Sequence, residues 1–152
     1  SLSPMARILV VDDEPDIRAV LCARLQAAGY AVEVARNGLE ALARVRSQRP
    51  DLVILDLMLP GADGFSVCAM LKRDQRFADI PVIILSARNK PADQQNAAAL
   101  GADAYLTKPF RPEELLGYVA SLLNRNRADA DGAESRPTIN GDERIPAPQV
   151  AS

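Results

Sequence analysis

The stretch DLVILDLMLPGADGF, residues 51–65, contains a short apolar run that is interrupted by an aspartate. The run 52–57 is too short for a buried helix and is rich in Val, Ile and Leu, which predicts a buried strand. Its one charged residue is Asp56, and a charge at the end of a buried strand is costly unless it is paired or bound to a metal. The stretch therefore predicts a strand that presents Asp56, with a solvated turn carboxylate as the alternative.

Similar apolar runs alternate with stretches of helical periodicity along the chain. The other strands are expected at 7–11, 31–35, 82–85 and 104–106, and the helices at 16–28, 38–47, 65–73, 92–100 and 113–124. Continuous apolar strands separated by helices are typical of a parallel sheet that is covered on both faces, with right-handed crossovers. We therefore expect the α/β class, with a single doubly wound five-stranded parallel sheet.

Length and composition restrict the organisation of the chain and its partners. A chain of 152 residues with 48% apolar residues favours one domain, assigned here to residues 7–126. Residues 1–6 are interpreted as an N-terminal extension or a cloning remnant, and residues 127–152, poor in large apolar side chains, as a disordered tail or a truncated linker. The net charge of -2 gives no electrostatic reason for direct binding of nucleic acid or an anionic membrane. Without a bilayer-spanning segment or a signal peptide, we expect a cytoplasmic protein.

Polar side chains end four of the five predicted strands. Asp12 and Asp13 follow the first run, Asp56 ends the third, Ser86 the fourth, and Lys108 follows the fifth. Ligands of open α/β sheets bind at the carboxyl ends of the strands, so these side chains should converge. Three carboxylates at close range repel one another unless a cation neutralises them, and all-oxygen ligation suits Mg²⁺, with Mn²⁺ as its expected substitute.

Four segments resemble the receiver domains of bacterial response regulators, in the order of that family. They are ILVVDDEP at 8–15, DLVILDLMLPGADGF at 51–65, PVIILSA at 81–87 and GADAYLTKPF at 101–110. The resemblance extends from residue 7 to about residue 124. It implies a (βα)5 flavodoxin-like fold with the strand order 2-1-3-4-5.

The same resemblance assigns roles at the acidic cluster. It implies that Asp56 is the nucleophile and the phosphorylation site, and that Asp13, Asp56 and the backbone carbonyl of Met58 bind Mg²⁺ directly. Asp12 would hold metal-bound water. A carboxylate is a competent nucleophile, and phosphoryl transfer depends mainly on positioning and charge neutralisation.

The resemblance also assigns the residues that respond to the phosphoryl group. Lys108 would pair with it, Ser86 would hydrogen-bond one of its oxygens, and Tyr105 would turn inward when Ser86 moves. The Lys108–Pro109 bond is commonly cis in this family. In that family the face made by the fourth helix, fifth strand and fifth helix controls a partner or an effector domain, and we expect a phosphorylation-dependent homodimer as one outcome.

The absence of histidine implies a separate donor, a sensor histidine kinase or a phosphotransfer protein. The chain would then be a signalling phosphoacceptor that catalyses only its own phosphorylation and dephosphorylation, and not an enzyme acting on other substrates. Whether it is a stand-alone regulator or a receiver cut from a longer protein stays open.

Simpler interpretations stay open for each residue alone. Asp12 or Asp13 could cap the following helix, Ser86 could cap another, Lys108 could be a surface lysine, and Tyr105 an edge-strand aromatic. A phosphorylation-independent receiver that acts as a binding module is one alternative function. An aspartyl-nucleophile phosphatase is a weaker one, because such enzymes carry a second Asp where Met58 stands.

Overall fold

The computed structural model describes residues 5–61 and 63–132, and within them it contains alternating strands and helices. The strands are β1 (Arg7–Val11), β2 (Ala31–Ala35), β3 (Leu52–Asp56), β4 (Val82–Ser86) and β5 (Ala104–Thr107). The helices are α1 (Pro15–Ala27), α2 (Gly38–Ser47), α3 (Gly64–Arg73), α4 (Pro91–Ala99) and α5 (Pro112–Gly132). The predicted alternation is confirmed, and most element ends differ from the prediction by one residue at most.

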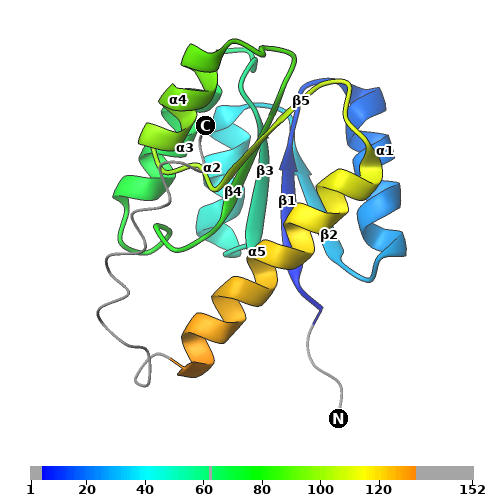
Figure 1. The fold of residues 1–152 in the computed structure, drawn as a ribbon, viewed down its shortest axis with the longest axis vertical. Helices are drawn as coiled ribbons and strands as arrows, with labels where there is room; N and C mark the ends of the chain where they lie inside the picture. The colour runs from blue at the N-terminus through cyan, green and yellow to red at the C-terminus, as the bar shows by residue number, and fades with distance from the viewer. Residues whose placement is uncertain (1–4, 62, 133–152) are drawn as a thin grey trace.

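The strands form one parallel sheet in the order β2-β1-β3-β4-β5, which confirms the predicted α/β fold and strand order. Figure 1 shows α1 and α5 on one face of this sheet and α2, α3 and α4 on the other. In the register of the sheet, Val11 pairs with both Ala35 and Leu55, and Asp56 pairs with Leu85. The ends of β1, β3 and β4 therefore meet at one edge.

The strand sequences fill both faces of the sheet with apolar side chains. In β1, Ile8 and Val10 belong to the core under α1 and α5, whereas Leu9 and Val11 belong to the core under α2, α3 and α4. Every residue of β3 and of β4 is buried. Because successive side chains of a strand point to opposite faces, an uninterrupted apolar run is what a doubly covered strand requires.

Helix α5 is longer than the sequence pattern predicts. It was expected to end at Asn124, but it continues to Gly132, so the expectation of a disordered tail is wrong for residues 127–132. Ala and Arg are good helix formers, and a helix that is already docked extends without a new nucleation step. The remainder of the predicted tail, 133–152, and residues 1–4 of the predicted extension lie outside the described residues. Among the described helices, none is long and apolar enough to cross a membrane.

Candidate functional site

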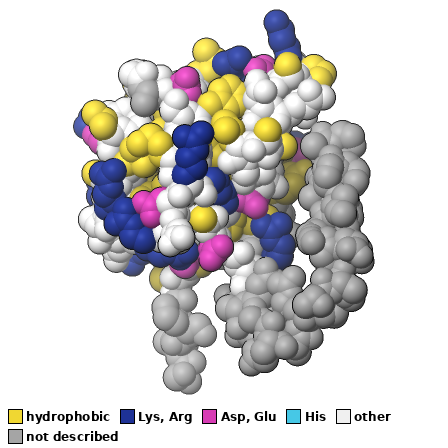
Figure 2. All heavy atoms as spheres, turned by 90° about the vertical axis from the view of Figure 1, so that its left-hand side faces the viewer, with side chains coloured by type: hydrophobic (Ala, Val, Ile, Leu, Met, Phe, Trp, Pro, Cys, Tyr) yellow, Lys and Arg dark blue, Asp and Glu magenta, His cyan; other side chains and the backbone are white. Residues whose placement is uncertain are grey.

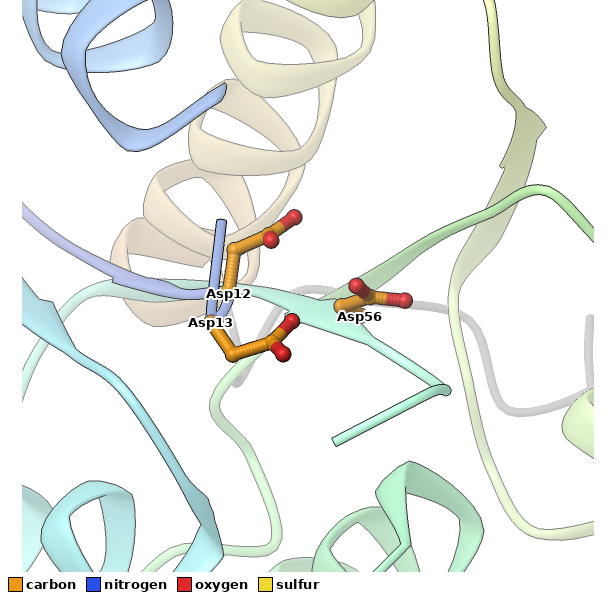
Figure 3. Close-up of side chains that lie close together, drawn as sticks. All are labelled: Asp12, Asp13 and Asp56. Carbon is orange, nitrogen blue, oxygen red and sulfur yellow. The ribbon is translucent and has the colours of Figure 1, made fainter. Parts of the chain in front are cut away.

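Three aspartates meet at the carboxyl ends of β1 and β3. Asp12 and Asp13 directly follow β1, and Asp56 is the last residue of β3. One carboxylate oxygen from each lies within 4.8 Å of the others, and Figure 3 shows Asp12 and Asp13 extending toward the side on which Asp56 lies. Asp12 and Asp56 are buried, at 1% and 3% exposure, while Asp13 is exposed. The predicted convergence of these carboxylates is thus present in the structure.

Lys108 brings the compensating positive charge to this cluster. Its Nζ lies 3.0 Å from Asp12 Oδ2 and 3.1 Å from Asp56 Oδ2. Burial opposes the charged ammonium, but the hydrogen bonds and charges of Asp12 and Asp56 raise the pKa of Lys108 above its usual value. The ammonium is therefore charged at neutral pH and held against the two buried carboxylates.

Burial, neighbouring charges and a backbone hydrogen bond act on the Asp56 carboxylate. Burial raises the pKa of Asp56 above its usual value, and the charge of Asp12 adds to this, whereas the Met58 N–H and Lys108 favour the ionised form. Met58 N donates to Asp56 Oδ1 at 3.0 Å, so the backbone after β3 folds back over the carboxylate. Met58 itself is 57% exposed. Its backbone carbonyl as a metal ligand stays a prediction.

Gly64 contributes to the site through its missing side chain. A Cβ at this position would collide with the backbone carbonyl oxygen of Asp56 and would lie 2.6 Å from Leu57 Cα. Gly64 N also donates to the carbonyl oxygen of Leu57 at 2.9 Å. The first residue of α3 therefore packs directly on the backbone that carries Asp56.

Glu14 is a site residue that the sequence reasoning missed. Its Oε1 lies 3.2 Å from Lys108 Nζ, and its backbone N donates to Asp12 Oδ1 at 2.9 Å. Arg18 donates from Nη1 to the carbonyl oxygen of Asp12 at 2.7 Å. Its position directly after the Asp12-Asp13 pair could have drawn attention to Glu14, because that position lies at the same edge of the sheet.

Ser86 and Tyr105 lie beside the site and are linked through Arg88. Ser86 is fully buried at the end of β4, and its Oγ accepts from Arg88 N at 3.1 Å. The Tyr105 hydroxyl donates to the carbonyl oxygen of Arg88 at 2.7 Å. Burial is the main cause that raises the pKa of Tyr105 above its usual value. A chain of hydrogen bonds thus connects Ser86, next to the acidic cluster, with the aromatic residue of β5.

A backbone hydrogen bond joins the end of β4 to the loop after β5, beside the acidic cluster. Lys108 N donates to the carbonyl oxygen of Ser86 at 2.8 Å, so the residue after β5 is tied to the end of β4. The Lys108–Pro109 peptide bond is cis. The structure therefore brings Asp12, Asp13, Asp56 and Lys108 together and ties the backbone of Lys108 to Ser86 at the end of the adjacent strand.

The donor set suits a hard divalent cation. Three carboxylates at the ends of two neighbouring strands offer oxygen atoms only, close enough for one ion to bridge them. Mg²⁺ prefers such oxygen ligands and retains several of its waters, which fits a cluster with an exposed member, Asp13. The residues present therefore fit the predicted magnesium site.

Comparison with known proteins agrees with this geometry. Residues 8–120 match the family described as "Response regulator receiver domain". The chain is 44% identical over 136 residues to the DNA-binding dual master transcriptional regulator RpaA of Synechocystis, covering 90% of this chain and 56% of that protein. It is 40% identical over 144 residues to the DNA-binding response regulator MtrA of Mycobacterium leprae, covering 95% and 62%. The chain thus spans less than two thirds of either relative.

Solved structures show the same fold. The chemotaxis response regulator CheY4 of Vibrio cholerae superposes with a TM-score of 0.74 at 36% identity, covering 78% of this chain and 99% of that one. NtrX of Brucella abortus superposes with a TM-score of 0.80 at 29% identity, covering 88% of this chain and 30% of that one. The fold described here therefore occurs both over the whole length of a known chain and as part of a much longer one.

Proposed function

The chain belongs to the response regulator receiver domain family of two-component systems, and we propose that it accepts a phosphoryl group on Asp56. The donor is the phosphohistidine of a sensor histidine kinase or of a phosphotransfer protein. The observation that carries the proposal is the buried Asp56 carboxylate, 3.1 Å from the Lys108 ammonium and within reach of the carboxylates of Asp12 and Asp13.

In the proposed phosphoryl transfer, the chain mainly positions the reacting groups and neutralises charge. An Asp56 carboxylate oxygen attacks phosphorus, the P–N bond of the donor breaks with its electron pair leaving on the imidazole, and an O–P bond forms. The Met58 N–H and the Lys108 ammonium hold the carboxylate in place for this attack. Since phosphoryl transfer depends on in-line placement and on neutralising spread negative charge, Lys108 is suited to follow that charge onto the new phosphoryl oxygens.

Asp12, Asp13 and Asp56, with the backbone carbonyl of Met58, are the residues proposed to hold Mg²⁺, Asp12 through water. When bound, the ion would neutralise negative charge on the phosphoryl oxygens and on the carboxylates themselves. Mn²⁺ is the expected substitute, because it accepts the same oxygen ligands.

The response to phosphorylation is proposed to run through Ser86 and Tyr105. Ser86 ends β4 beside Asp56 in the sheet, where its hydroxyl would donate to a phosphoryl oxygen. Arg88 is hydrogen-bonded to both Ser86 and Tyr105, so a movement of Ser86 would reach Tyr105 through Arg88. The face made by α4, β5 and α5 would change with it and act on an effector domain or a partner protein, with homodimerisation as one expected outcome.

The output proposed is control of transcription in a longer protein. The Synechocystis and Mycobacterium relatives are named as DNA-binding regulators, and the chain spans 56% and 62% of their lengths. This supports a receiver that controls a DNA-binding effector domain, while the receiver itself, in a chain whose overall net charge is -2, has no excess of positive charge with which to bind DNA. It catalyses only its own phosphorylation and dephosphorylation, in the cytoplasm.

The test is the intact mass of the chain after incubation with Mg²⁺ and acetyl phosphate or phosphoramidate. We expect one added phosphoryl mass on the native chain, none on Asp56→Asn, and none on the native chain in excess chelator. A native chain that gains no mass while remaining folded would favour the phosphorylation-independent binding module.

A further inference from the structure

A groove lies between α2 and α3, away from the site described above. These helices pack against each other on the same face of the sheet and, with the segment that follows α3, border an open hollow of about 350 Å³. It is lined by Leu42, Val45, Arg46, Met70, Arg73, Asp74 and Phe77. We call these residues the α2–α3 groove. Four of the seven are apolar, and the others are two arginines and one aspartate.

The apolar surface of the groove continues onto solvent-exposed side chains of both helices. Met70 of α3 is 47% exposed, and Leu39, which is 79% exposed, lies one helical turn before Leu42 on α2. Figure 2 faces the side of the molecule that carries α3 and α4 and shows hydrophobic side chains exposed between Lys and Arg side chains. Grouped apolar side chains around a hollow are more typical of a binding surface than isolated exposed ones.

The rim of the groove carries unbalanced positive charge. Among the described residues, Arg46 and Arg73 form no ion pair, whereas Asp74 is already paired with Arg76 at 2.6 Å. Arg49 adds a further positive charge near this rim. A hydrogen bond of 3.2 Å from its Nε to the carbonyl oxygen of Arg76 holds it there. The helix dipole is another reason for basic residues in the last turns of α2 and α3, because it favours positive charge at the end of a helix. It does not explain the apolar hollow beside them.

We propose that the α2–α3 groove binds an acidic amphipathic helix of a protein partner. An apolar stripe of that helix occupies the hollow, and its acidic side chains pair with Arg46 and Arg73. Nucleic acid is a poorer occupant, because the aromatic ring of the groove, Phe77, is only 8% exposed and offers no face on which a base could stack.

The groove is distinct from the phosphorylation site in both position and chemistry. Each crossover helix returns the chain to the edge where the strands begin, so the last turns of α2 and α3 lie opposite the carboxyl end of β3, where Asp56 stands. Binding in the groove therefore needs no phosphoryl group, and it can be tested whether or not Asp56 is phosphorylated.

The test is an NMR titration of the ¹⁵N-labelled full chain with a designed peptide helix that has one leucine stripe and a glutamate-rich opposite face. We expect chemical shift changes concentrated at 39–46 and 70–77, and an affinity that falls as salt rises. Two control peptides keep the same length: in one the leucines are scattered around the helix, and in the other lysine replaces glutamate. Both are expected to bind at least tenfold more weakly.

Variants of the chain separate the groove from general charge attraction. Arg46→Glu with Arg73→Glu should weaken the acidic peptide at least tenfold, whereas Arg24→Glu with Lys90→Glu makes the same change of charge at exposed positions elsewhere and should have little effect. Met70→Gln changes an exposed side chain and should weaken binding without loss of the fold.

Several outcomes would overturn the proposal. They are the absence of binding by the acidic peptide, equal binding of the peptide with scattered leucines, equal loss in the two charge variants, or equal binding of a single-stranded DNA oligonucleotide. The last two would indicate a general attraction for polyanions.

Discussion

Replacement of Gly64 by alanine tests how the start of α3 supports Asp56. The added Cβ would lie 2.6 Å from Leu57 Cα and would collide with the carbonyl oxygen of Asp56, against an ordinary separation of about 3.5–4.0 Å. Both atoms belong to the backbone, so neither can rotate away as the end of a side chain would. Either α3 or the Asp56–Leu57 segment must shift by about 1 Å.

The size of the effect follows from two opposing contributions. Overpacking of this kind costs about 1–3 kcal/mol, and backbone contacts favour the upper part of that range. Alanine in place of glycine recovers at most about 1 kcal/mol of helix propensity. We therefore expect Gly64→Ala to lower the free energy of unfolding by about 1–2 kcal/mol. A shift of about 1 Å at a reacting group can cost on the order of 10²-fold in rate, so phosphorylation should slow at least tenfold.

Gly117 provides the matched control within α5. A Cβ there meets no atom within 4 Å, so Gly117→Ala should stabilise the chain by up to about 1 kcal/mol and leave phosphorylation unchanged. Urea unfolding measures the stabilities, and the rate of mass gain with acetyl phosphate measures the reaction. Equal stabilities and equal rates for the two variants would refute the idea that position 64 requires glycine because α3 packs so closely on the Asp56–Leu57 backbone.

Three further predictions concern the metal and two ionisable groups. Adding Mg²⁺ should raise the thermal unfolding midpoint of the native chain and raise that of Asp13→Asn less, because a ligand of the folded state stabilises it; equal rises in differential scanning fluorimetry would argue against Asp13 as a ligand. The hydrogen bonds from Arg36 lower the pKa of Glu40 to about 2, so the contribution of this pair to stability is present above pH 4.5 and is lost as the pH falls through about 2. An NMR titration in which Arg36→Ala leaves that pKa unchanged would contradict this cause. Burial raises the pKa of Cys68 to about 11, so at pH 8 a thiol reagent should label the half-buried Cys22 first, and faster labelling of Cys68 would show that its burial is transient.

The fold and the strand-end residues could be predicted because buried parallel strands have a simple signature. Each is a short apolar run, and a polar residue at its end, such as Asp56 or Ser86, is visible without any knowledge of the tertiary structure. The carboxyl ends of parallel strands share an edge, so the convergence of these residues with Lys108 follows from topology alone. The ion pairs of Lys108 with Asp12 and Asp56 are the outcome of that topology.

Other features depend on distances that the linear pattern does not contain. The contact of Glu14 with Lys108 joins two loops far apart in the sequence, and the contact of Gly64 with the Asp56 backbone depends on how closely α3 packs on β3. The end of α5 was missed because the residues after Asn124 carry no apolar stripe. Polar contacts are present here instead: Arg125 donates to the carboxylate of Asp103, and Asn126 donates to the carbonyl oxygen of Asp79.

Reductive trapping shows whether Asp56 itself carries the phosphoryl group. Borohydride reduces an aspartyl phosphate to homoserine, so the chain would be treated with acetyl phosphate and Mg²⁺, reduced, digested and sequenced by mass spectrometry. We predict homoserine at position 56 in the native chain, and none when the phosphoryl donor or Mg²⁺ is omitted. Homoserine at Asp12 or Asp13 instead of Asp56, or at no position in a chain that has gained a phosphoryl mass, would mean that Asp56 is not the phosphorylation site.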